Sequence, residues 1–228
     1  MQRGLRGLLN LGLKLVYPAA CLACRQSMDT GFICSTCLFK LEKITGNEWI
    51  KNIPYLSGID RVYACWYYNP TLQALIQNMK YHNFARLGNF LGQKAVEEFD
   101  EEVFDGLDYL VPVPLNSLKY RERGYNQAQR ISEGMAQVLK IPVKKRIKRI
   151  KYTLSQTSLT REERLYNMEN AFVISGSVYQ KKIGVIDDLL TTGATLSACA
   201  AAIKAAGAIE VRAITCASPI MSTKMNPC

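Results

Sequence analysis

Residues 183–195 read IGVIDDLLTTGAT, and this stretch decides the fold. Its apolar first half is typical of a strand that is buried on both faces of a parallel sheet. Asp187 and Asp188 end that apolar run. Open α/β sheets bind their ligands at the carboxyl ends of their strands. We therefore expect the two carboxylates to face a ligand site.

A loop of small residues follows the two acids and leads into a helix. Thr191, Thr192, Gly193, Ala194 and Thr195 can direct backbone N–H groups and hydroxyls at one phosphate, helped by the helix dipole. The missing Cβ of Gly193 lets the backbone approach such a ligand closely. The alternative is an ordinary turn in which Asp and Thr only cap the helix. An acid pair next to this loop favours a ligand with sugar hydroxyls at one end and a phosphate at the other.

The flanking sequence alternates between strand and helix patterns. Strands are expected at 61–68, 109–115, 143–150, 171–174, 182–187 and 209–217, and helices at 70–80, 86–99, 125–139 and 195–206. This alternation predicts an α/β fold in which a mostly parallel sheet has helices on both faces.

The length and composition fit one main domain with a small module. The chain has 228 residues, of which 48% are apolar and 21% charged, and these values exclude wholesale disorder. We assign residues 1–57 to a short amphipathic helix, a cysteine module and a linker, and residues 58–228 to the α/β domain. The absence of an uncharged apolar run of ~18 residues argues against a transmembrane segment.

Four of the eight cysteines form two closely spaced pairs, Cys21-x-x-Cys24 and Cys34-x-x-Cys37. Two such turns can complete a tetrahedron of sulfur around Zn²⁺, and a site filled by four sulfurs is structural. The alternative is four unrelated buried thiols. The other cysteines are scattered, which is typical of ordinary thiols in a reducing compartment, so we expect a cytoplasmic protein.

The net charge of +10 favours polyanionic partners, namely nucleic acid, phosphorylated metabolites or an anionic membrane surface. The most basic segment is residues 144–152, a candidate patch for single-stranded DNA on which an aromatic ring could stack against a base. Its members are Lys144, Lys145, Arg146, Lys148, Arg149, Lys151 and Tyr152. The alternative is a solvated edge strand whose lysines prevent aggregation, and the sequence leaves the two readings balanced.

Residues 183–195 resemble the phosphoribosyl pyrophosphate (PRPP) signature of type I phosphoribosyltransferases. Further landmarks resemble the ComF family, and together they cover nearly the whole chain. They are the cysteines of 21–37, Lys80-Tyr81, VPVPL at 111–115, RERGYNQ at 121–127, the segment 156–167 and Ala171-Phe172. The resemblance implies an amino-terminal zinc ribbon joined to a type I phosphoribosyltransferase-like domain, and a link to natural DNA uptake in bacteria.

The resemblance also implies roles for individual residues. Asp187 and Asp188 would contact the ribose hydroxyls of PRPP, and residues 191–195 would hold its 5′-phosphate. The loop that begins at Pro114 would receive the pyrophosphate, with Mg²⁺ bridging it to the ribose. Arg121 and Arg123 lie just downstream and offer planar forks for phosphate oxygens. In the other reading, these two arginines belong to an exposed basic loop.

A segment containing Gln156, Arg161 and Arg164 resembles a mobile element that closes over the ligand. In the alternative reading, the two arginines pair with the neighbouring Glu162 and Glu163 on one helix. Cys21 belongs to the metal set, so we do not expect a glutamine-hydrolysing nucleophile.

Two functions follow from these features. The first is an enzyme that transfers phosphoribose from PRPP, or from another phosphorylated ribose, to an unidentified nitrogen acceptor with release of pyrophosphate. The second is a non-enzymatic factor in natural transformation that senses PRPP and binds single-stranded DNA. A scaffold for the DNA-uptake machinery is a third, weaker option. The sequence identifies neither the acceptor nor the oligomeric state.

Overall fold

The computed structural model describes residues 19–46, 48–82, 84–150 and 171–219. The expected amino-terminal amphipathic helix lies outside these residues. The same holds for Lys151 and Tyr152 of the basic segment, and for the segment that carries Gln156, Arg161 and Arg164.

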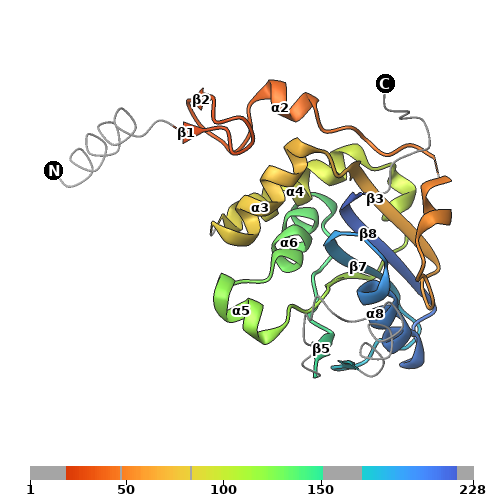
Figure 1. The fold of residues 1–228 in the computed structure, drawn as a ribbon. Helices are drawn as coiled ribbons and strands as arrows, with labels where there is room; N and C mark the ends of the chain where they lie inside the picture. The colour runs from red at the N-terminus through yellow and green to blue at the C-terminus, as the bar shows by residue number, and fades with distance from the viewer. Residues whose placement is uncertain (1–18, 47, 83, 151–170, 220–228) are drawn as a thin grey trace.

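A four-stranded parallel sheet forms the centre of the fold (Figure 1). Its strand order is β3-β8-β7-β4, and every neighbouring pair runs parallel. The strands are β3 (Arg61–Tyr67), β4 (Tyr109–Pro112), β7 (Lys182–Leu189) and β8 (Glu210–Ser218). β7 is an inner strand, so its carboxyl end lies between the carboxyl ends of β8 and β4. This arrangement confirms the predicted α/β class.

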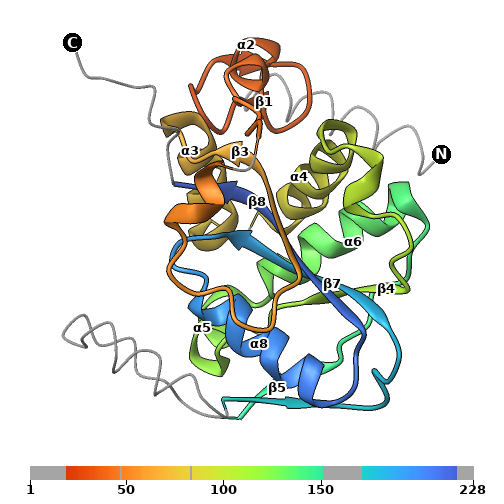
Figure 2. The same ribbon diagram turned by 90° about the vertical axis from the view of Figure 1, so that its right-hand side faces the viewer.

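Helices cover both faces of this sheet (Figure 2). Over one face lie α3 (Pro70–Tyr81), α4 (Ala85–Glu98) and α6 (Gln127–Leu139), and over the other lies α8 (Ala194–Ala205). Each of these four helices begins and ends within two residues of its predicted bounds. The agreement follows from the helical spacing of apolar residues in all four segments.

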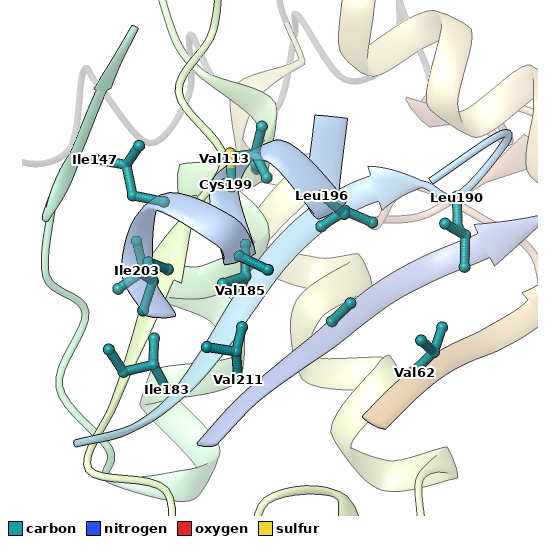
Figure 3. Packing of buried hydrophobic residues seen from close by; sticks show 14 of the residues in the cluster. Val62, Val113, Ile147, Ile183, Val185, Leu190, Leu196, Cys199, Ile203 and Val211 are labelled. Atoms are coloured by element: carbon teal, nitrogen blue, oxygen red, sulfur yellow. The ribbon is translucent and has the colours of Figure 1, made fainter. Parts of the chain in front are cut away.

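Two hydrophobic cores sandwich the sheet, because successive residues of a strand point to opposite faces. Val185 of β7 belongs to the core under α8, and its neighbour Ile186 belongs to the core under α3, α4 and α6. Figure 3 shows Leu196 and Ile203 of α8 packed beside Val185 and Val211. β7 is therefore held from both sides, and its carboxyl end is a rigid platform.

Glycines let α4 and α6 pack backbone to backbone. A Cβ on Gly92 would collide with the carbonyl oxygen of Ile131, and one on Gly134 would collide with the carbonyl oxygen of Asn89. This close contact fixes α6 over the sheet, so its first residue lies near the end of β7.

Three short elements differ from the predicted pattern. β5 (Ile147–Arg149) and β6 (Phe172–Ile174) form a separate antiparallel ribbon, so the expected 143–150 strand is short and lies outside the main sheet. The segment after Pro114, expected as a loop, contains α5 (Ser117–Arg123). α5 has no buried residue. A helix that buries no side chain needs no periodic apolar positions, so the sequence pattern did not predict it. The Asn116 side chain caps its start, and Gly124, with φ of +74°, ends it.

The cysteine module packs against the α3–α4 face. It contains β1 (Ala19–Ala20), β2 (Ser27–Met28) and α2 (Ser35–Phe39). The Asn78 amide of α3 donates to the Leu22 carbonyl over 3.1 Å, and the rings of Phe32 and Phe90 lie 5.7 Å apart. Two 3-10 turns, η1 (Glu48–Asn52) and η2 (Glu101–Val103), complete the described elements. Within the described ranges, no helix is long and apolar enough to cross a membrane.

Candidate functional site

A cleft of about 310 Å³ lies at the carboxyl ends of β4 and β7. Both acids of β7 line it, and so does the segment that follows β4. Its walls are Lys80, Val113, Pro114, Leu115, Asn116, Lys119, Arg123, Gln127, Arg149, Asp187, Asp188, Leu189, Thr191 and Thr195. The structure thus brings together residues that lie more than 100 positions apart in the sequence.

Asp188 is buried and is held by two side chains from the helical face. Its carboxylate forms an ion pair with Lys80, from the last turn of α3, and accepts a hydrogen bond from the Gln127 amide over 3.3 Å. Burial opposes ionisation of Asp188, but the Lys80 ammonium outweighs it and holds the pKa of Asp188 below its usual range. The same attraction raises the pKa of Lys80 against its own burial. Asp188 is therefore a fixed negative charge in the cleft wall.

Asp187 differs from its neighbour in both exposure and charge. It is half-buried, and its Oδ1 accepts the backbone N–H of Asp188 over 2.9 Å. Burial, together with the adjacent Asp188 charge, raises the pKa of Asp187 well above its usual range. Neighbouring carboxyl groups whose pKa values are pushed apart are typical of sites with distinct roles for each acid.

Gln127 reaches Asp188 because the start of α6 is tied to the end of β4. Asn126 caps α6 by accepting the Ala128 backbone N–H over 2.9 Å, and its amide donates to the Val113 carbonyl over 2.8 Å. Arg123 in turn donates to Oε1 of Gln127 over 3.0 Å. A continuous chain of polar contacts therefore runs from α5 to Asp188.

The loop after β7 encloses a second, small cavity of about 40 Å³ at the start of α8. Asp187 and residues 189–196 line it, so it joins the cleft at Asp187. Gly193 has φ of +80°, and a Cβ there would collide with the carbonyl oxygen of Tyr55. The Tyr55 N–H also donates to the Thr192 carbonyl over 3.2 Å. The backbone of Tyr55 thus fixes the position of the loop. The positive end of the α8 dipole faces a space of the size of an anion.

Cations from other elements also line the cleft. Lys119 and Arg123 of α5 and Arg149 of β5 line it. Arg121 lines a neighbouring cavity of about 400 Å³ instead. Arg123 lines both cavities, whereas Arg121 lines only the neighbouring one of the two, because residues two apart on a helix point in different directions.

Several cleft residues were not predicted to bind PRPP, among them Lys80, Lys119, Gln127 and Arg149, the last of which was predicted only as part of the nucleic-acid patch. Lys80 and Gln127 stand in segments that resemble the ComF family, but no local pattern places either of them beside an acid far along the chain. Arg149 carries a usable signal, since it lies two residues after the buried Ile147 on a strand and must share its inward face.

The basic segment does not present all its described cations to solvent. Lys144 lies 4.5 Å from the ring centre of Tyr109, and Arg146 donates to the Ser175 carbonyl over 3.2 Å. Arg149 lies over the ring of Phe172 and lines the cleft. Lys145 and Lys148 are exposed.

The four paired cysteines converge as predicted. The Sγ atoms of Cys21, Cys24, Cys34 and Cys37 lie within 4.8 Å of one another. Those of Cys24 and Cys34 are 3.8 Å apart, about the edge of a tetrahedron with Zn–S bonds of ~2.3 Å. The backbone N–H of Cys34 donates to Cys21 Sγ, and that of Cys37 to Cys34 Sγ, each over 3.4 Å. The cluster is compatible with a structural zinc ion.

Curated proteins with similar sequences include competence proteins. Competence protein F of Haemophilus influenzae is 27% identical over 213 residues, which are 88% of this chain and 90% of that protein. Competence protein ComFC of Streptococcus pneumoniae is 31% identical over 151 residues, 65% of this chain and 64% of that protein. The chain is similar to these competence proteins over most of its length. DNA utilization protein YhgH of Escherichia coli K12 is 27% identical over 150 residues, 64% of this chain and 66% of that protein.

No model of a known protein family matches this chain. Solved structures with similar parts include a glutamine PRPP amidotransferase from Bacillus subtilis, with a TM-score of 0.40 and 20% identity over 61% of this chain and 30% of that one. A purine phosphoribosyltransferase from Pyrococcus horikoshii gives a TM-score of 0.33 and 20% identity over 63% of this chain and 77% of that one. Scores this low support no statement about the ligand.

The ion pair of the cleft makes a prediction about stability. Lys80→Met leaves the Asp188 charge buried without its partner, which should lower the free energy of unfolding at pH 7 by about 3–5 kcal/mol in urea denaturation. The double variant Lys80→Met with Asp188→Asn removes the stranded charge and should recover most of this loss. A double variant no more stable than Lys80→Met would contradict the assignment.

The same pair predicts a pH dependence. The lowered pKa of Asp188 stabilises the fold above its unfolded pKa of about 3.9, and this contribution is lost as the pH falls through the lower folded value. The raised pKa of Lys80 stabilises the fold below about pH 10.4, and this contribution is lost above that pH. Without Lys80, burial raises the pKa of Asp188 above its usual value, so Asp188 of the variant takes up a proton at a higher pH than it does when unfolded. The Lys80→Met deficit should therefore begin to shrink above about pH 4 as the pH is lowered.

Proposed function

We propose that the cleft binds Mg²⁺–PRPP and supports transfer of its phosphoribosyl group to a nitrogen acceptor. One observation carries the proposal. The acid pair of β7 and the small-residue loop line adjoining cavities that share Asp187, and the cations Lys119, Arg123 and Arg149 line the cleft as well. This arrangement matches a ligand with a phosphate at one end, sugar hydroxyls in the middle and a pyrophosphate at the other end.

Each part of PRPP then has a chemically suitable partner. The 5′-phosphate fits the loop of residues 191–195, where backbone N–H groups and threonine hydroxyls are available. The sugar hydroxyls can donate to Asp187. The pyrophosphate fits the side of Pro114, Lys119, Arg123 and Arg149. Arg121 stands one cavity away, and a role for Arg161 and Arg164 stays a prediction.

The transfer step needs little covalent chemistry from the protein. A bond forms between the acceptor nitrogen and ribose C1, the C1–O bond to pyrophosphate breaks, and its electron pair leaves on the pyrophosphate oxygen. The acceptor nitrogen loses its proton to solvent. Positive charge builds on the sugar, which the fixed Asp188 carboxylate favours, and the cleft cations favour the leaving group. Mg²⁺ arrives with the pyrophosphate, and carboxylate and phosphate oxygens are the ligands it prefers.

Calorimetric titration with Mg²⁺–PRPP tests the binding half. Asp187→Asn removes a carboxyl oxygen that can accept from the sugar hydroxyls and should raise the Kd at least about tenfold. Asp105→Asn, at an exposed acid elsewhere, should leave the Kd unchanged. Binding that is absent in the wild type, or equal in both variants, contradicts the proposal. The transfer half requires pyrophosphate release with at least one of ammonia, anthranilate, adenine, hypoxanthine or uracil.

We further propose that the four-cysteine cluster binds one structural zinc ion, because all four of its ligands are sulfur and none leaves a position for water. Cys24→Ser should reduce the zinc content well below about one ion per chain, measured by elemental mass spectrometry. It should also lower the Tm, since the module packs on α3 and α4. Thr36→Ala, at an exposed position between two of the ligands, should retain the zinc. Full zinc occupancy in Cys24→Ser would contradict the proposed four-cysteine zinc site.

Binding of single-stranded DNA is the second candidate function. Its support is the set of relatives named for competence and DNA utilization, together with the exposed Lys145 and Lys148. A role with the uptake machinery rests on the same names.

Affinity for a labelled single strand should fall steeply with salt. Lys145→Ala with Lys148→Ala should lower the slope of log K against log salt by about 1.4, since each lost phosphate contact removes about 0.7. Arg86→Ala, at an exposed residue of α4, should not change the slope. Fluorescence anisotropy measures both, and a flat response to salt counts against this function.

A further inference from the structure

The cavity of about 400 Å³ beside the cleft has the size of a small-molecule site. Its walls are Lys80, Tyr81, Arg121, Glu122, Arg123 and Gly124, from the ends of α3 and α5. Lys80 and Arg123 also line the cleft, so the two spaces share a wall. The proposed PRPP cleft makes no use of Tyr81 or Glu122.

The walls of this cavity are locked together by a buried tyrosine. Tyr125 follows α5 directly, and its hydroxyl donates to the Met79 carbonyl in the last turn of α3. Gly124 turns the chain between α5 and Tyr125 in a left-handed conformation, and a Cβ there would meet nothing within 4 Å. The space is therefore formed before any ligand arrives.

An aromatic surface is available in this cavity. The Tyr81 side chain is 71% exposed, which is high for a large ring, and the Arg123 guanidinium lies 5.4 Å from its centre. Aromatic rings and arginine planes are the groups on which nucleobases stack. A flat heterocycle could thus gain contact area that water now occupies.

The charged groups of the cavity add a second requirement. Arg121 is exposed and supplies a cation beyond Lys80, which pairs with Asp188, and Arg123, which bonds Gln127. Arginine is suited to phosphate oxygens. The exposed Glu122 supplies an acceptor for ring or amino N–H groups. A ligand that satisfies all of these groups carries both a flat nitrogen heterocycle and a phosphate.

We propose that this cavity binds a nucleotide, with its base stacked on Tyr81 and its phosphate on Arg121. The site is separate from the PRPP cleft and goes beyond the function proposed for that cleft. The nucleotide could be free or part of a single strand, since both carry the same chemistry. The two spaces share Lys80 and Arg123 but are otherwise lined by different residues, so we expect both ligands to be bound at once.

Calorimetric titration with AMP tests the proposal, alone and with saturating Mg²⁺–PRPP. We expect AMP to bind under both conditions. Tyr81→Leu should weaken AMP binding at least about tenfold, because base–aromatic stacking is lost. Tyr81→Phe, which keeps the ring, should bind as the wild type does. Tyr120→Leu, at a half-exposed tyrosine of α5 that lines neither cavity, is the matched control and should also bind normally.

Two further arms identify the contacts and the source of the nucleotide. Arg121→Gln should weaken binding of AMP but not of adenosine, which has no phosphate. A short single-stranded oligodeoxyadenylate is titrated with the same variants by fluorescence anisotropy. Tighter binding of the strand than of AMP, with the same dependence on Tyr81, assigns the site to single strands, whereas binding of AMP alone assigns it to free nucleotides.

Absence of binding by both probes would overturn the proposal. So would equal affinity in Tyr81→Leu and the wild type, or full displacement of AMP by Mg²⁺–PRPP, which would place AMP in the cleft. Failure of PRPP itself to bind is a distinct result. It contradicts the function proposed for the cleft, and the AMP series without PRPP then decides this inference.

Discussion

A buried ion pair between Lys80 and Asp188 joins the two halves of the site. A carboxylate taken out of water is costly unless a cation and hydrogen bonds replace the lost hydration, and here Lys80 and Gln127 supply both. Lys80 comes from α3, Gln127 from α6 and Asp188 from β7. The pair therefore requires the helical layer and the sheet to be correctly packed before the cleft exists, and it places the positive wall of the neighbouring cavity as well.

The platform for this pair is the carboxyl end of a central parallel strand. Two separate cores hold β7, one under α8 and one under the other three helices. The same strand end leads directly into the loop around Gly193, whose backbone is pressed against Tyr55 from the preceding linker. An acid pair and an anion-sized space are thus neighbours because one strand and one turn produce both. This geometry gives the proposed phosphoribosyl ligand a physical basis in one strand and one turn.

The small elements outside the sheet decide how the cleft is used. α5 has no buried side chain, yet it supplies Arg123 and Lys119 to the cleft and Arg121 to the adjoining cavity. The β5–β6 ribbon turns Arg149 inward and leaves Lys148 outside. The cysteine module packs on α4 and on α3, the helix that carries Lys80. Binding of metal, of phosphoribose and of a nucleotide would therefore act on one connected set of helices.

The sequence by itself determined the α/β class, the four long helices, the cysteine cluster and the acid–loop combination at the end of β7. These features depend on local periodicity, on close spacing or on one strand–turn–helix unit. The short elements were less predictable, since α5 buries nothing and β5 pairs with a segment far along the chain. Only the tertiary structure decided that Lys80 and Gln127 hold Asp188, that Arg123 lines both cavities while Arg121 lines only one of them, and that Arg149 faces the cleft. The physical reason is that such contacts join residues from different elements, and no local pattern records which elements will be neighbours once both faces of the sheet are packed.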